Sequence, residues 1–148
     1  MKVRPAELWD VPALFDLAER FHAEAAAGFP LPEPQAIHQT ILECQRFGVL
    51  CCLVAEEEKI IGFLTGACSR FPHSMKSIAG MTMFYVSKEK RGTVAARRLL
   101  EEFMGWCRSN AASVVCCGSI SGIKEERFGM FLEKQGFRKA GAAYVREL

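Results

Sequence analysis

The order of elements along this chain predicts an α/β (α+β) fold, in which about four helices flank a mixed, mostly antiparallel central sheet. Three observations support this prediction. Apolar runs of strand length alternate with segments whose apolar residues recur at helical spacing. Residues 49–56 and 60–68 are two such runs joined by a short charged turn, as in an antiparallel hairpin. The resulting order is strand, two helices, three strands, and then helix, strand, helix and strand.

The size and composition of the chain suit a single domain spanning residues 1–148. Of its 148 residues, 50% are hydrophobic, which is enough for a core of its own. The net charge is +2 with both signs interspersed, which argues against a dedicated nucleic-acid binder. No apolar run follows the charged N-terminal residues, and the longest, residues 49–55, is far too short to span a bilayer. We therefore expect a cytoplasmic protein without nucleic-acid or membrane partners.

The cysteines predict no metal site. There are seven, an odd number, and none shows the Cys-x-x-Cys spacing of zinc sites. Cys51-Cys52 and Cys116-Cys117 are adjacent pairs within apolar runs. Neighbouring strand residues point to opposite faces of a sheet, so neither pair can hold one ion jointly. Reduced, buried cysteines are the expected state.

The first half of the chain predicts an edge strand and two helices. Pro5 restricts the strand at residues 2–6 to a sheet edge, because proline cannot donate to a strand ladder. Asp10 is a favourable N-cap for the helix that follows. Three prolines between residues 28 and 34 break the chain before the second helix, at about residues 34–47. That break could form one wall of a substrate cleft or be a plain connector.

The second half predicts the centre of the sheet and the elements that cover it. A long strand that is apolar on both faces belongs inside a sheet. Gly136 is expected to end the last helix in the left-handed conformation. The expected elements, in order, are a central strand at 77–86, a helix at 92–110, a buried strand at 113–118, a helix at 125–135 and a last strand or strand pair at 137–145.

The junction between the central strand and its helix predicts an anion site. The strand ends at Val86, a short charged turn follows, and Arg91-Gly92 begins the helix with small and hydroxyl side chains. The first amides of a helix have no partners inside it and lie at the positive end of the helix dipole. Such an end binds phosphate groups readily. The basic residues of the chain also gather here, namely Lys88, Lys90, Arg91, Arg97 and Arg98.

Two motifs resemble the GCN5-related N-acetyltransferase (GNAT) family, and the order of elements is similar along essentially the whole chain. Residues 86–96 resemble the acetyl-CoA motif, in which a strand ends in valine and Gln/Arg-x-x-Gly-x-Gly/Ala follows after a few residues. Residues 131–137 resemble the late helix of the family, which closes with a Gly-Phe pair. Residues 141–148 also look like the ends of the short members often carried by tailed bacteriophages.

The resemblance implies an N-acetyltransferase with acetyl-CoA as co-substrate. In the family the pantetheine arm lies along the central strand, and the pyrophosphate sits on the first amides of the next helix. The central strand and the following one splay apart to admit the thioester. The residues that this implies for cofactor binding are Phe84, Tyr85 and Val86 on the strand, Arg91 before the helix, and Gly92, Thr93, Val94, Ala95, Ala96 and Arg97 at its start.

Three departures from the family pattern bear on catalysis. Val94 stands where glycine is usual in the phosphate loop. Leu132 stands where many members have a tyrosine that protonates the leaving thiolate. Residues 81–83 offer no glutamate where some members carry a general base on the central strand. These departures leave two alternatives: an active enzyme, or a catalytically weak or inactive module that binds CoA or a protein partner.

The remaining acid and base candidates are few. Tyr144 could act as an acid or pack in the last strand, and Ser119 could donate a proton or belong to a turn. Residues 56–58 could supply a base or form a solvated turn. Cys117 could carry the acetyl group, but nothing nearby in the sequence would lower its pKa.

We therefore expect a primary amine to attack the thioester directly. The acceptor is open: an amine-bearing small molecule, an amino acid, a peptide or a protein. A homodimer is compatible with the aromatic-rich ends of the chain.

Overall fold

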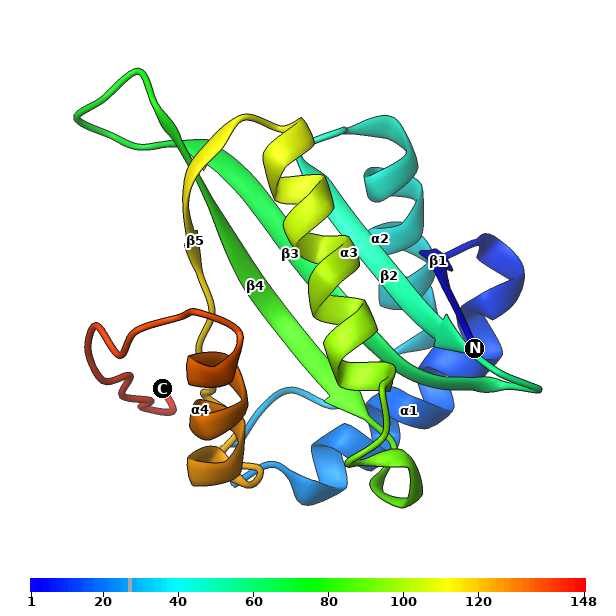
Figure 1. Cartoon of the computed structure of the whole chain (residues 1–148). Helices are drawn as coiled ribbons and strands as arrows, with labels where there is room; N and C mark the ends of the chain where they lie inside the picture. The colour runs from blue at the N-terminus through cyan, green and yellow to red at the C-terminus, as the bar shows by residue number, and fades with distance from the viewer. Residues whose placement is uncertain (27) are drawn as a thin grey trace.

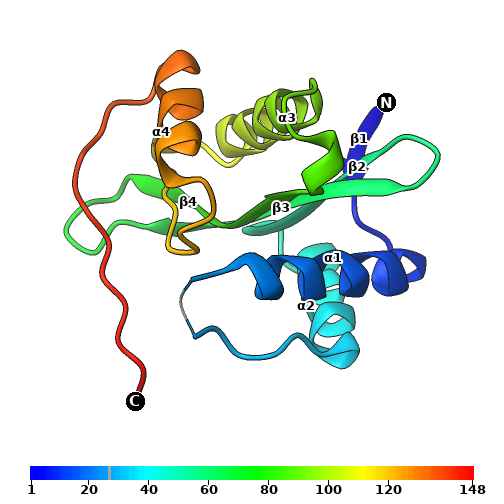
Figure 2. The same cartoon turned by 90° about the horizontal axis from the view of Figure 1, so that it is seen from below.

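A computed structural model describes residues 1–26 and 28–148 as a sheet between two layers of helices. The sheet has the strand order β1-β2-β3-β4-β5, antiparallel from β1 to β4 and parallel between β4 and β5. Figure 1 shows the elements and Figure 2 the layers: α3 and α4 cover one face, and α1 and α2 cover the other. The strands are β1 (Lys2–Pro5), β2 (Leu50–Glu56), β3 (Ile60–Arg70), β4 (Ser77–Val86) and β5 (Ala112–Cys116). The helices are α1 (Val11–Glu24), α2 (Pro34–Arg46), α3 (Ala95–Ser109) and α4 (Glu125–Lys134), with short 3₁₀ helices η1 (Leu8–Asp10) and η2 (Lys88–Lys90).

These elements confirm the predicted fold class. The β2–β3 hairpin forms where the two apolar runs meet, and β1 is an edge strand, as Pro5 requires. No helix in the described part of the chain is both long enough and apolar enough to cross a membrane.

The two faces of the sheet carry separate hydrophobic cores. Along β2 the side chains alternate, so that Cys51 packs with the core under α3 and Cys52 with the core under α1 and α2. The adjacent cysteines therefore lie on opposite faces, as predicted. At the centre of the first core, Phe103 of α3 is fully buried and lies over Gly66 of β3. A Cβ at Gly66 would meet the Phe103 ring, so this glycine lets the helix approach the sheet.

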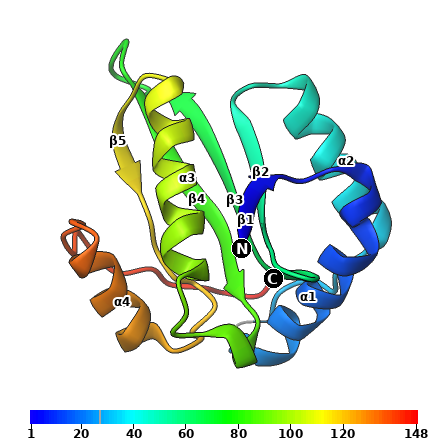
Figure 3. The ribbon, with the colours of Figure 1, turned by 45° about the vertical axis from the view of Figure 1, so that its right-hand side comes forward.

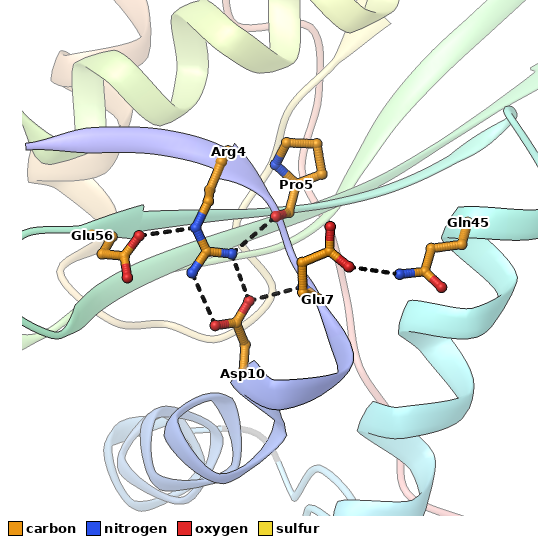
Figure 4. A network of polar contacts seen from close by, with 6 residues as sticks. All are labelled: Arg4, Pro5, Glu7, Asp10, Gln45 and Glu56. Atoms are coloured by element: carbon orange, nitrogen blue, oxygen red, sulfur yellow. Dashed lines mark hydrogen bonds and ion pairs between the residues drawn. The ribbon is translucent and has the colours of Figure 1, made fainter.

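A partly buried ion-pair network attaches the α1 layer to the edge of the sheet (Figure 4). The Arg4 guanidinium on β1 donates to both oxygens of Asp10, at 2.7 and 3.0 Å, and to Glu56 of β2 at 2.9 Å. The Asp10 carboxylate also accepts the backbone N–H of Glu7 at 2.8 Å. Asp10 is the N-cap residue of α1, as predicted, but its side chain makes no capping bond to that helix, because Arg4 and the Glu7 amide occupy the carboxylate.

The feature that positions the site is the separation of β4 from β5. The two strands pair only through the first part of β4, Ser77–Gly80. Beyond that point they diverge, as Figures 1 and 3 show, and α4 lies beside the opening. On its other side β4 stays paired with β3, apart from an irregularity that leaves Thr82 between the paired residues Met81 and Met83. The last residues of β4 therefore keep one edge free of neighbouring strands.

Two predictions about the C-terminal third are wrong. Residues 137–145 form no strand, and the segment after α4 crosses the edge of the sheet without regular structure (Figure 2). Glycine and alanine, which are poor strand formers, occupy residues 140–143. With no strand added outside it, β5 is an edge strand and is not buried, and its Val114 is 55% exposed.

The end of α4 is as predicted. Gly136 has a φ of +89°, in the left-handed region that glycine adopts without strain. The N–H of Phe137 donates to the carbonyl of Leu132 at 3.1 Å, and the N–H of Gly136 donates to that of Glu133 at 3.0 Å. These bonds complete the helix end.

Candidate functional site: a cleft between β4, β5 and α4

A cleft of about 830 Å³ opens where β4 and β5 separate. Its walls are the free half of β4, the loop that leads into α3, residues 118–124, and one face of α4. Most of the residues expected to bind a cofactor line it, and so does the candidate acid Ser119. Those lining residues are Phe84, Tyr85, Val86, Arg91, Gly92, Thr93, Val94, Ala96 and Arg97. Ala95 is fully buried beneath the loop, and Tyr144 is outside the cleft lining.

The floor and one wall of the cleft are held together by aromatic packing. The ring of Phe84 on β4 lies 5.5 Å from that of Phe128 and 6.3 Å from that of Phe131, centroid to centroid. Both partners belong to α4, so these contacts fix the helix against the diverging edge of β4. The cleft is therefore a packed feature of the fold.

The loop into α3 presents free backbone donors to the cleft. Gly92 turns with a φ of +86°, and the Thr93 hydroxyl donates to the Lys90 carbonyl at 2.7 Å. The helix begins at Ala95, three residues later than predicted, and the Thr93 oxygen accepts the Ala95 N–H at 3.3 Å. Within the described part of the chain, the N–H groups of Ala96 and Arg97 make no hydrogen bond. They are available to an anion at the positive end of the helix.

Val94 fits this loop without strain. Its φ of −72° and ψ of −7° are right-handed helical values that a β-branched residue adopts readily. Val94 is 48% exposed and lines the cleft. Its side chain therefore adds bulk to the cleft lining at the position where glycine is usual.

Basic side chains from η2, α3 and α4 surround the cleft. Lys88 comes from η2 and Arg97 from the start of α3, where Arg97 also pairs with Glu101 at 2.6 Å. Lys124, Arg127 and Lys134 come from the start and body of α4. This second group could not be recognised from the sequence, because only the folded chain brings α4 beside the loop. Arg127 lies so close to Gly92 that a Cβ there would be 3.3 Å from its Nη2.

Arg91 lies in the cleft wall, and each of its three nitrogens donates to a protein group. Its guanidinium donates to both carboxylate oxygens of Glu24 at the end of α1, at 2.8 and 2.9 Å, and its Nε donates to the Val86 carbonyl at 3.0 Å. The Tyr85 hydroxyl donates to the same carboxylate at 2.6 Å. The bonds from Arg91 hold the pKa of Glu24 below its ordinary value, and burial with the bond to Glu24 raises that of Tyr85. Neither group is poised to exchange a proton near neutral pH.

Glu24 was not predicted as a site residue. It lies 67 positions from Arg91, and no local motif connects them. Only the packing of α1 across the end of β4 brings the two together.

The candidates for acid–base chemistry are placed very differently. The Ser119 hydroxyl lines the cleft and lies 3.3 Å from that of Ser121, in the irregular segment after β5. Tyr144 is 93% exposed in the C-terminal segment, because the strand that was expected to carry it does not form. Burial raises the pKa of the Cys117 thiol to about 12, so almost no thiolate is present at neutral pH. Leu132 is 8% exposed and belongs to the core under α4.

The acidic turn after β2 lies outside the cleft lining. Glu56 pairs with Arg4, and Glu57 pairs with Lys90 of η2. The structure therefore does not bring these carboxylates to the place where β4 and β5 diverge.

Comparison with known proteins agrees with this architecture. The family described as the acetyltransferase (GNAT) family matches residues 12–128. An acetyltransferase of Trypanosoma brucei has 18% sequence identity and a TM-score of 0.78, with 99% of each chain covered. Glucosamine-6-phosphate N-acetyltransferase from Arabidopsis thaliana has 18% identity and a TM-score of 0.78, covering 99% of this chain and 97% of that chain. An aminoglycoside acetyltransferase from an uncultured soil metagenomic sample has 16% identity and a TM-score of 0.74, covering 99% and 95%. No curated protein matches the sequence.

Proposed function

The chain belongs to the acetyltransferase (GNAT) family, and we propose that it transfers an acetyl group from acetyl-CoA to a primary amine. The observation that carries this proposal is the free edge of β4, which leads directly into a loop with unpaired amides. An extended thioester arm can bond to the free edge as an added strand would. The phosphates of the same molecule can then reach the amides at the start of α3.

We propose that each wall of the cleft holds a different part of acetyl-CoA. The backbone of Phe84, Tyr85 and Val86 holds the pantetheine arm, except that the Val86 carbonyl already accepts a bond from Arg91. The loop from Gly92 to Arg97 holds the pyrophosphate. Lys88 and Arg127 add positive charge beside it, since both line the cleft. No metal takes part in the proposed reaction.

The proposed reaction is direct attack of the amine on the thioester. The nitrogen forms a bond to the carbonyl carbon, and the Val86 amide on the free edge of β4 stabilises the oxyanion, because the neighbouring amide of Tyr85 faces its partner Phe63 on β3. Collapse breaks the carbon–sulfur bond, and the amine proton leaves to water. The departing thiolate has a pKa of about 8.5, so it can leave with little help, and Ser119 is the proposed donor in the cleft. The raised pKa of Cys117 supports direct transfer over an acetyl-cysteine intermediate.

The acceptor is proposed to enter beside the end of α1. Phe21 of α1 lines the cleft, and its ring lies 6.0 Å from that of Phe29 in the following segment. The His22 Nε2 also lies 3.0 Å from the Phe29 carbonyl oxygen. These contacts place Phe29 beside Phe21, but no described residue of the segment after α1 lines the cleft itself, so the role of this segment as a cleft wall stays a prediction. The acceptor class stays an amine-bearing small molecule, peptide or protein, and a homodimer and a cytoplasmic location stay predictions.

A second candidate function is a module that binds CoA or a protein partner with little or no catalysis. The buried position of Leu132 favours it, because no hydroxyl replaces the expected tyrosine at that point of α4. The two functions differ in what happens to the thioester after binding.

Release of free CoA thiol distinguishes the two. We expect acetyl-CoA to yield thiol faster when an amine is added, across a panel of α-amino compounds, amino sugars, aminoglycosides and lysine peptides. Mass spectrometry of the same mixtures should show an acetylated amine in equal amount. Binding of acetyl-CoA without amine-dependent release across this panel would favour the module and contradict the enzyme.

A further inference from the structure

One side chain joins three walls of the cleft. Arg91 contacts Glu24 at the end of α1 and the Val86 carbonyl at the end of β4, and its guanidinium carbon lies 5.3 Å from the centre of the Tyr85 ring. Gly92, which turns the phosphate loop, follows it directly in the chain. We refer to Glu24, Tyr85, Val86 and Arg91 as the Glu24 joint.

Three of the five N–H donors of Arg91 are used inside the protein. Its Nε donates to the Val86 carbonyl, and its two terminal nitrogens donate to the two carboxylate oxygens of Glu24 in a fork. Such bidentate pairs are strong and directional. The side chains of the pair are 19% and 28% exposed, so its charges are less screened than those of a surface pair. Only the other two N–H groups of Arg91 are left for a phosphate, unless this fork breaks.

We propose that Arg91 is a positioning residue that fixes the end of β4 and the start of the phosphate loop against α1, and that it is not itself a phosphate ligand. The inference rests on the proposed function, because it assumes that the loop binds acetyl-CoA. It adds that a carboxylate on the other helical layer, Glu24, is needed for the cofactor site to hold its shape. It also links the cofactor loop to α1, whose Phe21 lines the cleft.

Glu24→Gln distinguishes the two possible roles of Arg91, because they predict opposite changes in the affinity for acetyl-CoA. If Arg91 bound phosphate, removing a carboxylate beside it would free the arginine and make the site more positive, so acetyl-CoA would bind more tightly. If Arg91 is a positioning residue, the loss of the fork loosens the loop. We then expect about tenfold weaker binding of acetyl-CoA by titration calorimetry, a typical coupling for residues in one ion-pair network.

A matched control comes from the same region. Glu101 pairs with Arg97 in an exposed i,i+4 pair, so Glu101→Gln removes the same charge from beside a residue that lines the cleft. We expect this control to bind acetyl-CoA as tightly as the wild type or slightly more tightly. Both proteins are compared well below their melting temperatures, where a variant that had lost stability alone would show unchanged affinity.

Arg91→Lys provides a second, independent variant. Lysine keeps the charge but cannot form the fork and the third bond together. If Arg91 bound phosphate, lysine would largely replace it and the affinity for acetyl-CoA would change little. If Arg91 is a positioning residue, we expect the same tenfold loss of affinity as in Glu24→Gln. The double variant Glu24→Gln/Arg91→Lys should lose no more affinity than either single variant, because all three variants break the same unit.

The outcomes separate this inference from the proposed function. Wild-type protein that binds acetyl-CoA, with Glu24→Gln or Arg91→Lys binding equally well or better, would overturn the positioning role alone. Wild-type protein that binds no acetyl-CoA would overturn both.

Discussion

Replacing Gly92 with alanine tests the geometry of the proposed phosphate loop. Gly92 has a φ of +86°, a conformation that an L-residue adopts at a cost of about 1–2 kcal/mol. The added Cβ would lie 3.3 Å from the Arg127 Nη2, but that atom is the tip of a flexible exposed side chain and can move. The backbone strain therefore sets the magnitude, and we expect Gly92→Ala to lower the free energy of unfolding by about 1–2 kcal/mol.

Gly105→Ala is the matched control, and its expected effect on the free energy of unfolding has the opposite sign. Gly105 lies on the exposed side of α3, and a Cβ there would meet no atom within 4 Å. Alanine is better than glycine inside a helix by about 0.5–1 kcal/mol, so Gly105→Ala should raise the free energy of unfolding by that amount.

Urea unfolding of the two variants measures both effects. For a domain of this size, each kcal/mol corresponds to a melting shift of about 2–4 °C. Gly92→Ala should also be stabilised less by acetyl-CoA than Gly105→Ala, since its change falls in the proposed phosphate loop. A Gly92→Ala protein as stable as Gly105→Ala would refute the left-handed turn, and with it the loop shape on which the cofactor site depends.

Three further predictions concern the cleft and its surroundings. Ala96→Glu should abolish acetyl-CoA binding in calorimetry while leaving the melting temperature nearly unchanged, because it puts negative charge beside free amides. The control Ala96→Gln has a side chain of equal size without the charge and should bind acetyl-CoA better than Ala96→Glu. Cys117→Ala should keep within a fewfold of the wild-type rate of thiol release, and an acetylated Cys117 in quenched reactions would contradict direct attack. The bonds from Arg91 lower the folded-state pKa of Glu24, so their stabilisation is present above the unfolded carboxyl pKa of about 4.3 and is lost as the pH falls through the lower folded value. The stability gap between wild type and Glu24→Gln should therefore be constant near neutral pH and shrink below about pH 4, and a gap that widened in acid would reverse the sign of this interaction.

Local signals predicted the elements that create the cleft. The apolar run at residues 77–86, the charged turn and Gly92 are contiguous, so their order in the sequence is also their order along the cleft wall. The β2–β3 hairpin and the helix end at Gly136 likewise depend on short-range geometry. Such features are decided within a few residues and can be read without knowing the rest of the fold.

Features that depend on distant segments could not be predicted in this way. The fork between Arg91 and Glu24 forms only when α1 packs across the end of β4. Arg127 reaches the loop only because Phe84 holds α4 beside it. The segment at 137–145 has an apolar pattern that predicts a strand, but a strand also needs a partner edge, and the described chain does not pair it with β5. Whether an apolar run becomes a strand is decided by such long-range pairing.

The central claim is that the cleft between β4 and β5 binds acetyl-CoA, and thermal melting tests it most directly. The wild-type protein is melted with and without acetyl-CoA, with Ala96→Glu as a control whose cleft is blocked. Ligand at 100 times its dissociation constant should stabilise the wild type by about 2.7 kcal/mol, or about 5–11 °C at this size. Ala96→Glu should show no shift. Equal melting of the wild type with and without millimolar acetyl-CoA would contradict the account.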